Sequence, residues 1–189
     1  MKKLNYELIL ASKSPRRQHF FKDLGWDFKI ELKEVEEIYP SHLKHTEITD
    51  YLAELKSKPF NNLTNNQLVI TSDTIVWLDN KALGKPKNQN DAKKILASLS
   101  NKKHEVITSI CLKSNKKTKI INDVTEVYFK KLTDLEIEYY VSNFNPLDKA
   151  GAYGIQDWIG LIGVKKIKGS YFNVMGLPVH KLYEELSTF

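Results

Sequence analysis

The chain has 189 residues, of which 41% are hydrophobic and 28% charged, a composition typical of a folded globular domain and not of a disordered chain. A lone cysteine, Cys111, excludes an internal disulfide and is most simply a buried thiol. No apolar run approaches the length of a membrane span, and the apolar stretch that ends at Ala11 is too short for a signal peptide. We therefore expect a cytoplasmic protein with no membrane partner.

Strand-like and helix-like segments alternate along the first half of the chain, the pattern of an α/β fold. A first strand is expected at 7–11. Ser14 suits the N-cap and Pro15 the first position of the helix that follows, which Gly25 ends. Further elements are expected as a strand at 26–32, a helix at 46–56, and two strands at 68–70 and 75–78 that 71–74 interrupts.

The second half continues the alternation within one domain, predicted to cover residues 1–189. Residues 79–81 predict a hairpin turn. The next helix is expected at 91–99, with Asn88 or Asn90 as its cap, and Thr133 with Glu136 forms a capping box for another helix. The remaining elements are expected as long strands near 104–113 and 118–130, a glycine-rich loop at 145–163, a strand at 164–167 and a final helix from Pro178 to about Leu186.

Basic and hydroxyl side chains gather where the first strand meets the first helix. Ser12-Lys13-Ser14-Pro15-Arg16-Arg17 places two arginines and two hydroxyls at a helix N-terminus, whose N–H groups and partial positive charge attract anions. Such a set of groups suits a cradle for a phosphate or another oxyanion. A capped helix with solvated arginines is the alternative.

Asp73 stands between two apolar strand segments, where an unpaired carboxylate would be costly to bury. It could hold a metal ion or activate water, or it could be an acid in a tight turn. Glu36 and Glu37 form a further acidic pair, and Lys56 and Lys85 are single lysines, the latter in a turn set by Gly84 and Pro86.

The loop from Asp148 to Gln156 contains two glycines that allow a flat ligand to approach the backbone. Gln156 carries both a donor and an acceptor, which suits the reading of a base edge, although a structural turn is the simpler interpretation of the loop alone. Together, basic groups, acids and an amide predict a nucleotide site. The chain lacks G-x-x-x-x-G-K-[ST] and G-x-G-x-x-G, so it is neither a P-loop enzyme nor a dinucleotide binder of the usual kind.

Five segments stand out along the chain, namely Leu10–Arg17, Ser72–Thr74, Leu83–Pro86, Asp148–Gln156 and Met175–Pro178. In their order and spacing they resemble the Maf-like proteins, and the Gly154-Ile155-Gln156 segment resembles their dTTP/UTP pyrophosphatase subfamily. The resemblance covers nearly the whole chain. It implies an α/β fold with a mixed twisted sheet, flanking helices and two lobes around a deep cleft.

The same resemblance implies a house-cleaning enzyme that hydrolyses dTTP or UTP between the α and β phosphates, with Mg²⁺ or Mn²⁺, as a homodimer without stable nucleic-acid binding. It makes Asp73 the catalytic acid and a metal ligand, with Glu37 as a second metal ligand and Glu36 as its possible substitute. The substrate-binding positions it implies are Ser12, Arg16, Arg17, Lys56, Thr74, Lys85 and Gln156.

Two departures from the family pattern leave alternatives open. The family usually has Gly-Ala before the catalytic acid, where this chain has Thr71-Ser72, and Gly after the glutamine, where it has Asp157. The same chemistry on a modified purine such as 7-methyl-GTP is one alternative. A regulator of cell division that binds nucleotide without turnover is another.

Overall fold

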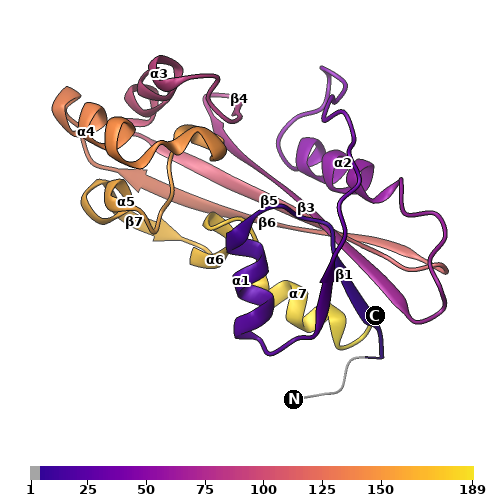
Figure 1. Ribbon diagram of the computed structural model, residues 1–189. Helices are drawn as coiled ribbons and strands as arrows, with labels where there is room; N and C mark the ends of the chain where they lie inside the picture. Colours follow the sequence, from indigo (N-terminus) through magenta and orange to yellow (C-terminus); the bar gives the residue numbers. More distant parts are fainter. Residues whose placement is uncertain (1–4) are drawn as a thin grey trace. The chain divides into compact units, whose positions relative to one another are not determined.

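The computed structural model describes residues 5–189, so Met1–Leu4 of the predicted domain lie outside the described residues. The fold is α/β, with a seven-stranded mixed sheet and flanking helices (Figure 1). The strands follow the order β2-β1-β3-β5-β6-β7, and β4 pairs with β3. This confirms the predicted fold class. No helix in the described part is long and apolar enough to cross a membrane.

The chain divides into two compact units that share three long strands. Of the described residues, the first unit comprises 5–73, 108–123 and 176–189, and the second comprises 74–107 and 124–175. The strands that run from one unit into the other are β3 (Gln67–Leu78), β5 (Lys103–Lys113) and β6 (Thr118–Phe129).

The first unit is built around parallel strand pairs. Its remaining elements are β1 (Glu7–Leu10), α1 (Pro15–Asp23), β2 (Phe28–Ile30), α2 (Thr46–Ser57) and α7 (Val179–Leu186). β1 pairs in parallel with both β2 and β3, with Leu10 opposite Ile30 and Ile70. Parallel neighbours require crossover connections, which α1 and α2 provide. The carboxyl end of β1 therefore lies beside residues 70–73 of β3.

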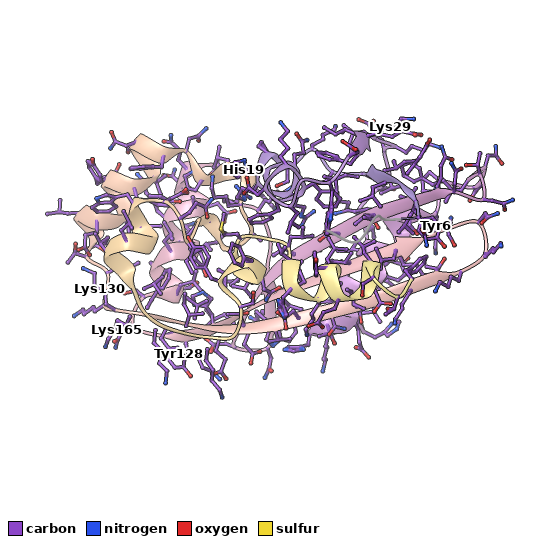
Figure 2. The ribbon with its side chains drawn as sticks, turned by 90° about the horizontal axis from the view of Figure 1, so that it is seen from below. Tyr6, His19, Lys29, Tyr128, Lys130 and Lys165 are labelled. Atoms are coloured by element: carbon purple, nitrogen blue, oxygen red, sulfur yellow. The ribbon has the colours of Figure 1, made fainter. Side chains whose placement is uncertain are left out.

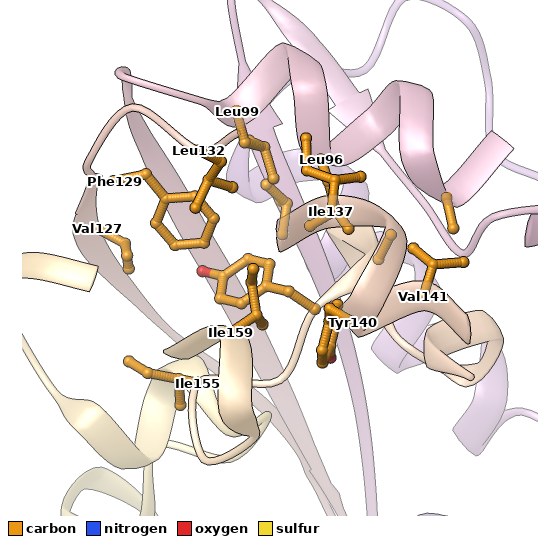
Figure 3. Packing of buried hydrophobic residues seen from close by; sticks show 14 of the residues in the cluster. Leu96, Leu99, Val127, Phe129, Leu132, Ile137, Tyr140, Val141, Ile155 and Ile159 are labelled. Atoms are coloured by element: carbon orange, nitrogen blue, oxygen red, sulfur yellow. The ribbon is translucent and has the colours of Figure 1, made fainter. Parts of the chain in front are cut away.

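The second unit holds a large cluster of buried hydrophobic residues. Its remaining elements are β4 (Lys81–Leu83), α3 (Gln89–Leu99), α4 (Asp134–Phe144), α5 (Trp158–Gly163), β7 (Val164–Lys168), α6 (Tyr171–Val174) and the short 3₁₀ turns Pro146–Asp148 and Ala150–Ala152. Figure 3 shows Leu96, Ile137, Tyr140 and Ile159 packed together from α3, α4 and α5. This core supports the loop that carries Gln156.

Most predicted helix signals are confirmed. Asn88, not Asn90, caps α3, with its side chain accepting a hydrogen bond from the backbone N–H of Asp91. Both halves of the Thr133–Glu136 capping box are present at α4. Asp79 and Asn80 have positive φ angles of 48° and 61° and join β3 to β4 as the predicted hairpin turn.

The strand predicted at 26–32 is shorter in the structure, where β2 covers Phe28–Ile30, and two further predictions about the elements are wrong. Residues 71–74 do not interrupt a strand, because β3 runs unbroken through them. The Thr71 hydroxyl donates to the carbonyl of Ala53 on α2, and Asp73 pairs with Lys56 on the same helix, so the polar residues have partners within the strand. The expected loop at 145–163 contains α5 and two 3₁₀ turns, because apolar residues such as Ile159 pack into the core of the second unit.

Candidate active site

Asp73 is a buried acid at the point where β3 leaves the first unit. Its residue is 7% exposed, and its Oδ1 lies 2.6 Å from the Nζ of Lys56 in the last turn of α2. A buried carboxylate is tolerated when a charge pairs with it, and Lys56 supplies that charge. The predicted catalytic acid is therefore paired with a lysine that was predicted to bind the substrate.

Glu37 contacts the same lysine. Its Oε2 lies 3.0 Å from the Nζ of Lys56, so two carboxylates from distant parts of the chain meet at one ammonium group. Of the two adjacent acids considered as metal ligands, Glu37 is the one that lies beside Lys56 and Asp73. Both glutamates are exposed to solvent.

The donor set at this point fits a divalent cation that shares its ligands with a substrate. Mg²⁺ is usually bound by one or two protein carboxylates together with phosphate oxygens and water. Asp73 and Glu37 supply two carboxylates. Within residues 5–189, no group of three or more His, Cys, Asp or Glu side chains could hold a metal ion. A cation bound here would therefore depend on oxygen atoms that the substrate brings.

The loop before α1 lies next to Asp73. Beyond the parallel pairing of Leu10 with Ile70, the N–H of Ala11 still donates to the carbonyl of Ile70 at 2.9 Å. Ser12 follows Ala11 directly, which brings the loop alongside Ser72 and Asp73. Ligand-binding groups commonly gather at the carboxyl ends of parallel strands in this way.

The hydrogen bonds in this loop differ from those predicted. Ser14 occupies the N-cap position, but its side chain makes no capping hydrogen bond. The Oγ of Ser12 instead accepts a hydrogen bond from the N–H of Ser14 at 3.2 Å, and Gln18 donates to the Ser12 carbonyl. The N-terminal turn of α1 is thus tied back onto the loop by Ser12.

Arg17 anchors the loop to its surroundings. Its Nε donates to the carbonyl of Gly176 and its Nη1 donates to the carbonyl of Ser72, both at 2.8 Å. Burial lowers the pKa of Arg17 to about 10, against the opposing effect of the Asp73 charge, so the guanidinium stays positive at neutral pH. Arg17 therefore contributes charge near Asp73 while two of its donors hold the backbone. Arg16 is half-buried on the same turn of α1.

The second unit contains the other predicted positions. Thr74 follows Asp73 on β3 and is half-buried, and Lys85 is exposed in the turn after β4. Gln156 lies two residues before Trp158, where α5 begins. The structure thus brings Asp73, Glu37 and Lys56 together in the first unit, beside the Ser12–Arg17 loop. Thr74, Lys85 and Gln156 belong to the second unit.

Gln156 carries an unused acceptor. Its Oε1 is buried and has no hydrogen-bond partner among the described residues. Buried side-chain acceptors are nearly always paired in folded proteins, so this oxygen is suited to a donor that a ligand supplies. Earlier in the same loop, the backbone at Gly151 (φ 69°) packs closely against β3, since a Cβ there would lie 2.6 Å from a methyl group of Val76.

Tyr153 fixes the start of this loop. Its hydroxyl lies 2.7 Å from the Nε2 of His104 on β5, and both rings pack edge-on against Phe129. Burial lowers the pKa of His104 to about 3, so its imidazole is neutral at physiological pH. Nothing in the sequence singles out His104, because a lone histidine in a strand belongs to no recognisable motif.

The sequence analysis also missed Tyr140 and Lys149. Their contacts explain how Asp157, one of the two departures from the family pattern, is accommodated. The Tyr140 hydroxyl contacts both the Asp157 carboxylate and the N–H of Gly154, and the Nζ of Lys149 lies 3.8 Å from the same carboxylate oxygen of Asp157. The acid that stands where the family usually has glycine is therefore part of a hydrogen-bonded cluster in the loop.

Ser72 belongs to the other departure from the family pattern, and its substitution is expected to change the stability of the protein. Its Oγ is buried and has no hydrogen-bond partner in the described part of the chain, and burying an unpaired hydroxyl is unfavourable. We expect Ser72→Ala to raise the free energy of unfolding by about 1 kcal/mol, measured by urea denaturation. Ser109→Ala is the matched contrast, because the Ser109 hydroxyl bonds to Thr49 and Asp50 at 2.6 Å and its loss should destabilise. Equal destabilisation by both changes would contradict the assignment of Ser72 as unpaired.

Comparison with known proteins identifies the family of the chain. The sequence profile of the family described as Maf-like protein matches residues 7–189. A protein of Flavobacterium psychrophilum named dTTP/UTP pyrophosphatase is 59% identical over 180 residues, which are 95% of this chain and 92% of that protein. A protein of Flavobacterium johnsoniae with the same name is 59% identical over 184 residues, covering 97% and 95% of the two chains. This chain belongs to the Maf-like protein family.

Proposed function

We propose that this protein is a nucleoside triphosphate pyrophosphatase that converts dTTP and UTP to the monophosphate and pyrophosphate. The observation that carries the proposal is the meeting of Asp73 and Glu37 at Lys56, beside the basic loop before α1. The proposal is supported by the name dTTP/UTP pyrophosphatase of relatives that match almost the full chain. A house-cleaning role on free nucleotides in the cytoplasm follows from the same proposal.

The reaction needs a water molecule to attack the α-phosphorus. In the proposed step Asp73 orients this water and accepts its proton, a bond forms between the water oxygen and the α-phosphorus, and the bond to the α–β bridging oxygen breaks. The pyrophosphate leaves with the electron pair of that bond. Lys56 and the Arg16–Arg17 pair stabilise negative charge on the phosphates, which is the main contribution a protein makes to phosphoryl transfer.

Asp73 and Glu37 are the residues that would hold the divalent cation, Mg²⁺ or Mn²⁺. When bound, the cation would neutralise phosphate charge and lower the pKa of a bound water. Lys56 would then share the two carboxylates with the cation. Its flexible four-carbon stem allows the ammonium to move from a carboxylate toward a phosphate oxygen.

Gln156 is the proposed reader of the base. Uracil and thymine present an N3–H donor next to the O4 acceptor. The unpaired Oε1 of Gln156 can accept from N3–H while its Nε2 donates to O4. This edge is common to UTP and dTTP, whereas cytosine has the opposite pattern of donor and acceptor. The amide therefore favours both proposed substrates over CTP.

Product analysis with and without metal tests the proposal. With UTP and Mg²⁺ or Mn²⁺ we expect UMP and pyrophosphate in equal amounts, and with excess chelator we expect a loss of at least about 10²-fold in turnover, because the phosphate charge is then compensated only by side chains. Orthophosphate and UDP as products would contradict cleavage between the α and β phosphates. Nucleotide binding without turnover would favour a regulator of cell division. Turnover of a modified purine alone would favour the same chemistry on a purine substrate.

The homodimer and the absence of stable nucleic-acid binding stay predictions. The mass of the protein in solution, compared with the 21.9 kDa of one chain, tests the first. Titration with labelled duplex and single-stranded DNA tests the second.

A further inference from the structure

Tyr140 combines an apolar environment with a polar end that faces the loop of Gln156. It lies on α4, is 0% exposed and belongs to the core of the second unit (Figure 3). Its hydroxyl donates to the Oδ2 of Asp157 at 2.7 Å and accepts from the N–H of Gly154 at 3.2 Å. Burial, together with the Asp157 carboxylate, raises the pKa of Tyr140, so the hydroxyl keeps the proton that it donates.

Asp157 uses its side chain for this contact and not for its helix. It occupies the N-cap position of α5, but its carboxylate makes no capping hydrogen bond. Its N–H donates to the carbonyl of Gly154 at 3.0 Å, and its own carbonyl accepts from the N–H of Gly160 at 2.9 Å. The side chain of Asp157 is 18% exposed, and the Nζ of Lys149 lies 3.8 Å from its Oδ2.

These contacts hold the chain on both sides of Gln156. Gly154 lies two residues before the glutamine and Asp157 one residue after it, and a single hydroxyl contacts both. The spacing is tight, because a Cβ on Gly154 would lie 2.5 Å from Oδ2 of Asp157. Gln156 therefore sits in a short closed segment whose two ends are fixed to the core.

We propose that Tyr140 and Asp157, assisted by Lys149, are positioning residues that fix the side-chain amide of Gln156 for base recognition and so set the selectivity of the enzyme. The inference rests on the proposed function. A reader of a base edge must hold its donor and acceptor in a fixed direction, since small displacements weaken hydrogen bonds steeply. A cluster anchored to buried Tyr140 provides that rigidity. A glycine after Gln156 would have no side chain to bond to Tyr140, so the cluster would be lost.

Three variants separate positioning from general stability. Tyr140→Phe keeps the ring and removes the hydroxyl. Asp157→Ala removes the acceptor, and Asp157→Asn keeps a side-chain oxygen that can accept from Tyr140. Tyr128→Phe is the matched control. The hydroxyl of Tyr128 also donates to a carboxylate, that of Glu126, at 2.7 Å, and Figure 2 shows Tyr128 projecting outward from the ribbon.

For Tyr140→Phe and Asp157→Ala we expect KM for UTP and dTTP to rise about tenfold and kcat to change less than about twofold, because the chemical groups at Asp73 are untouched. The ratio of kcat/KM for UTP over GTP should fall by about the same factor. Asp157→Asn should restore most of this ratio. The double variant Tyr140→Phe/Asp157→Ala should lose little more than either single change, since both remove one shared interaction. Tyr128→Phe should leave every value unchanged.

The outcomes distinguish a failure of this inference from a failure of the proposed function on which it rests. A wild-type protein that hydrolyses neither UTP nor dTTP overturns the proposed function and this inference with it. Wild-type activity with an unchanged UTP to GTP ratio in Tyr140→Phe and Asp157→Ala overturns the inference alone. If Tyr140→Phe fails to fold, Asp157→Ala compared with Asp157→Asn decides, because a difference in selectivity between those two supports positioning and equal selectivity contradicts it.

Discussion

Asp73→Asn is expected to lower kcat for UTP and dTTP by about 10³-fold while the protein stays folded. Asparagine has nearly the same shape but cannot accept the proton of the attacking water, and general-base catalysis alone contributes about 10²–10⁴-fold. Asparagine also lacks the charge that would help to hold a divalent cation. Steady-state pyrophosphate release measures the loss, and circular dichroism checks the fold.

Asp79→Asn is the matched control for this change. Asp79 also pairs with a lysine, with its Oδ2 2.7 Å from the Nζ of Lys102, but the pair is exposed at the hairpin after β3. Exposed ion pairs contribute little to stability, so activity should not change. Near-normal turnover in Asp73→Asn would remove Asp73 from the catalytic role.

Gln156→Glu is expected to change which base is accepted. The carboxylate has two acceptors and no donor, so it keeps a partner for N3–H of uracil and loses the partner for O4. The ratio of kcat/KM for UTP over GTP should fall roughly 10²-fold, since a buried polar group left unpaired costs selectivity. Guanine offers adjacent N1–H and N2–H donors, so relative activity on GTP should rise.

Gln67→Glu controls for the change in charge and shape. Its Oε1 accepts from the N–H of Thr64 in an exposed turn, and a carboxylate can make the same contact. It should leave the UTP to GTP ratio unchanged. An unchanged ratio in Gln156→Glu itself would mean that another group reads the base.

The sequence predicted the elements of the fold well where a local signal marks them. The capping box at Thr133 and Glu136 and the cap at Asn88 depend on residues three positions apart, so they can be read along the chain. The continuity of β3 could not be predicted in this way, because the hydrogen-bond partners of Thr71 and Asp73 come from α2, about 17 residues earlier. A polar segment between apolar runs predicts a break unless those partners are known.

The sequence indicated residues of the candidate site but not how they are arranged in space. Family resemblance indicated Asp73, Glu37 and Lys56 one by one, and their meeting at a single ammonium depends on the packing of α2 against β3. Tyr140 was hidden for another reason. Its spacing on α4 is that of an ordinary core residue, and only the structure reveals that its hydroxyl reaches the loop. Asp157 drew notice as a departure, but its partners could not be inferred from its position.

The proposed reaction is cleavage of dTTP and UTP into monophosphate and pyrophosphate. Its most direct test is pyrophosphate release from UTP, dTTP, CTP, ATP, GTP and 7-methyl-GTP, with Mg²⁺, with Mn²⁺ and with chelator. Metal-dependent release with the highest kcat/KM for UTP and dTTP is the predicted result. Release that favours a purine would keep the chemistry and contradict the role of Gln156, and no release from any triphosphate would contradict the account as a whole.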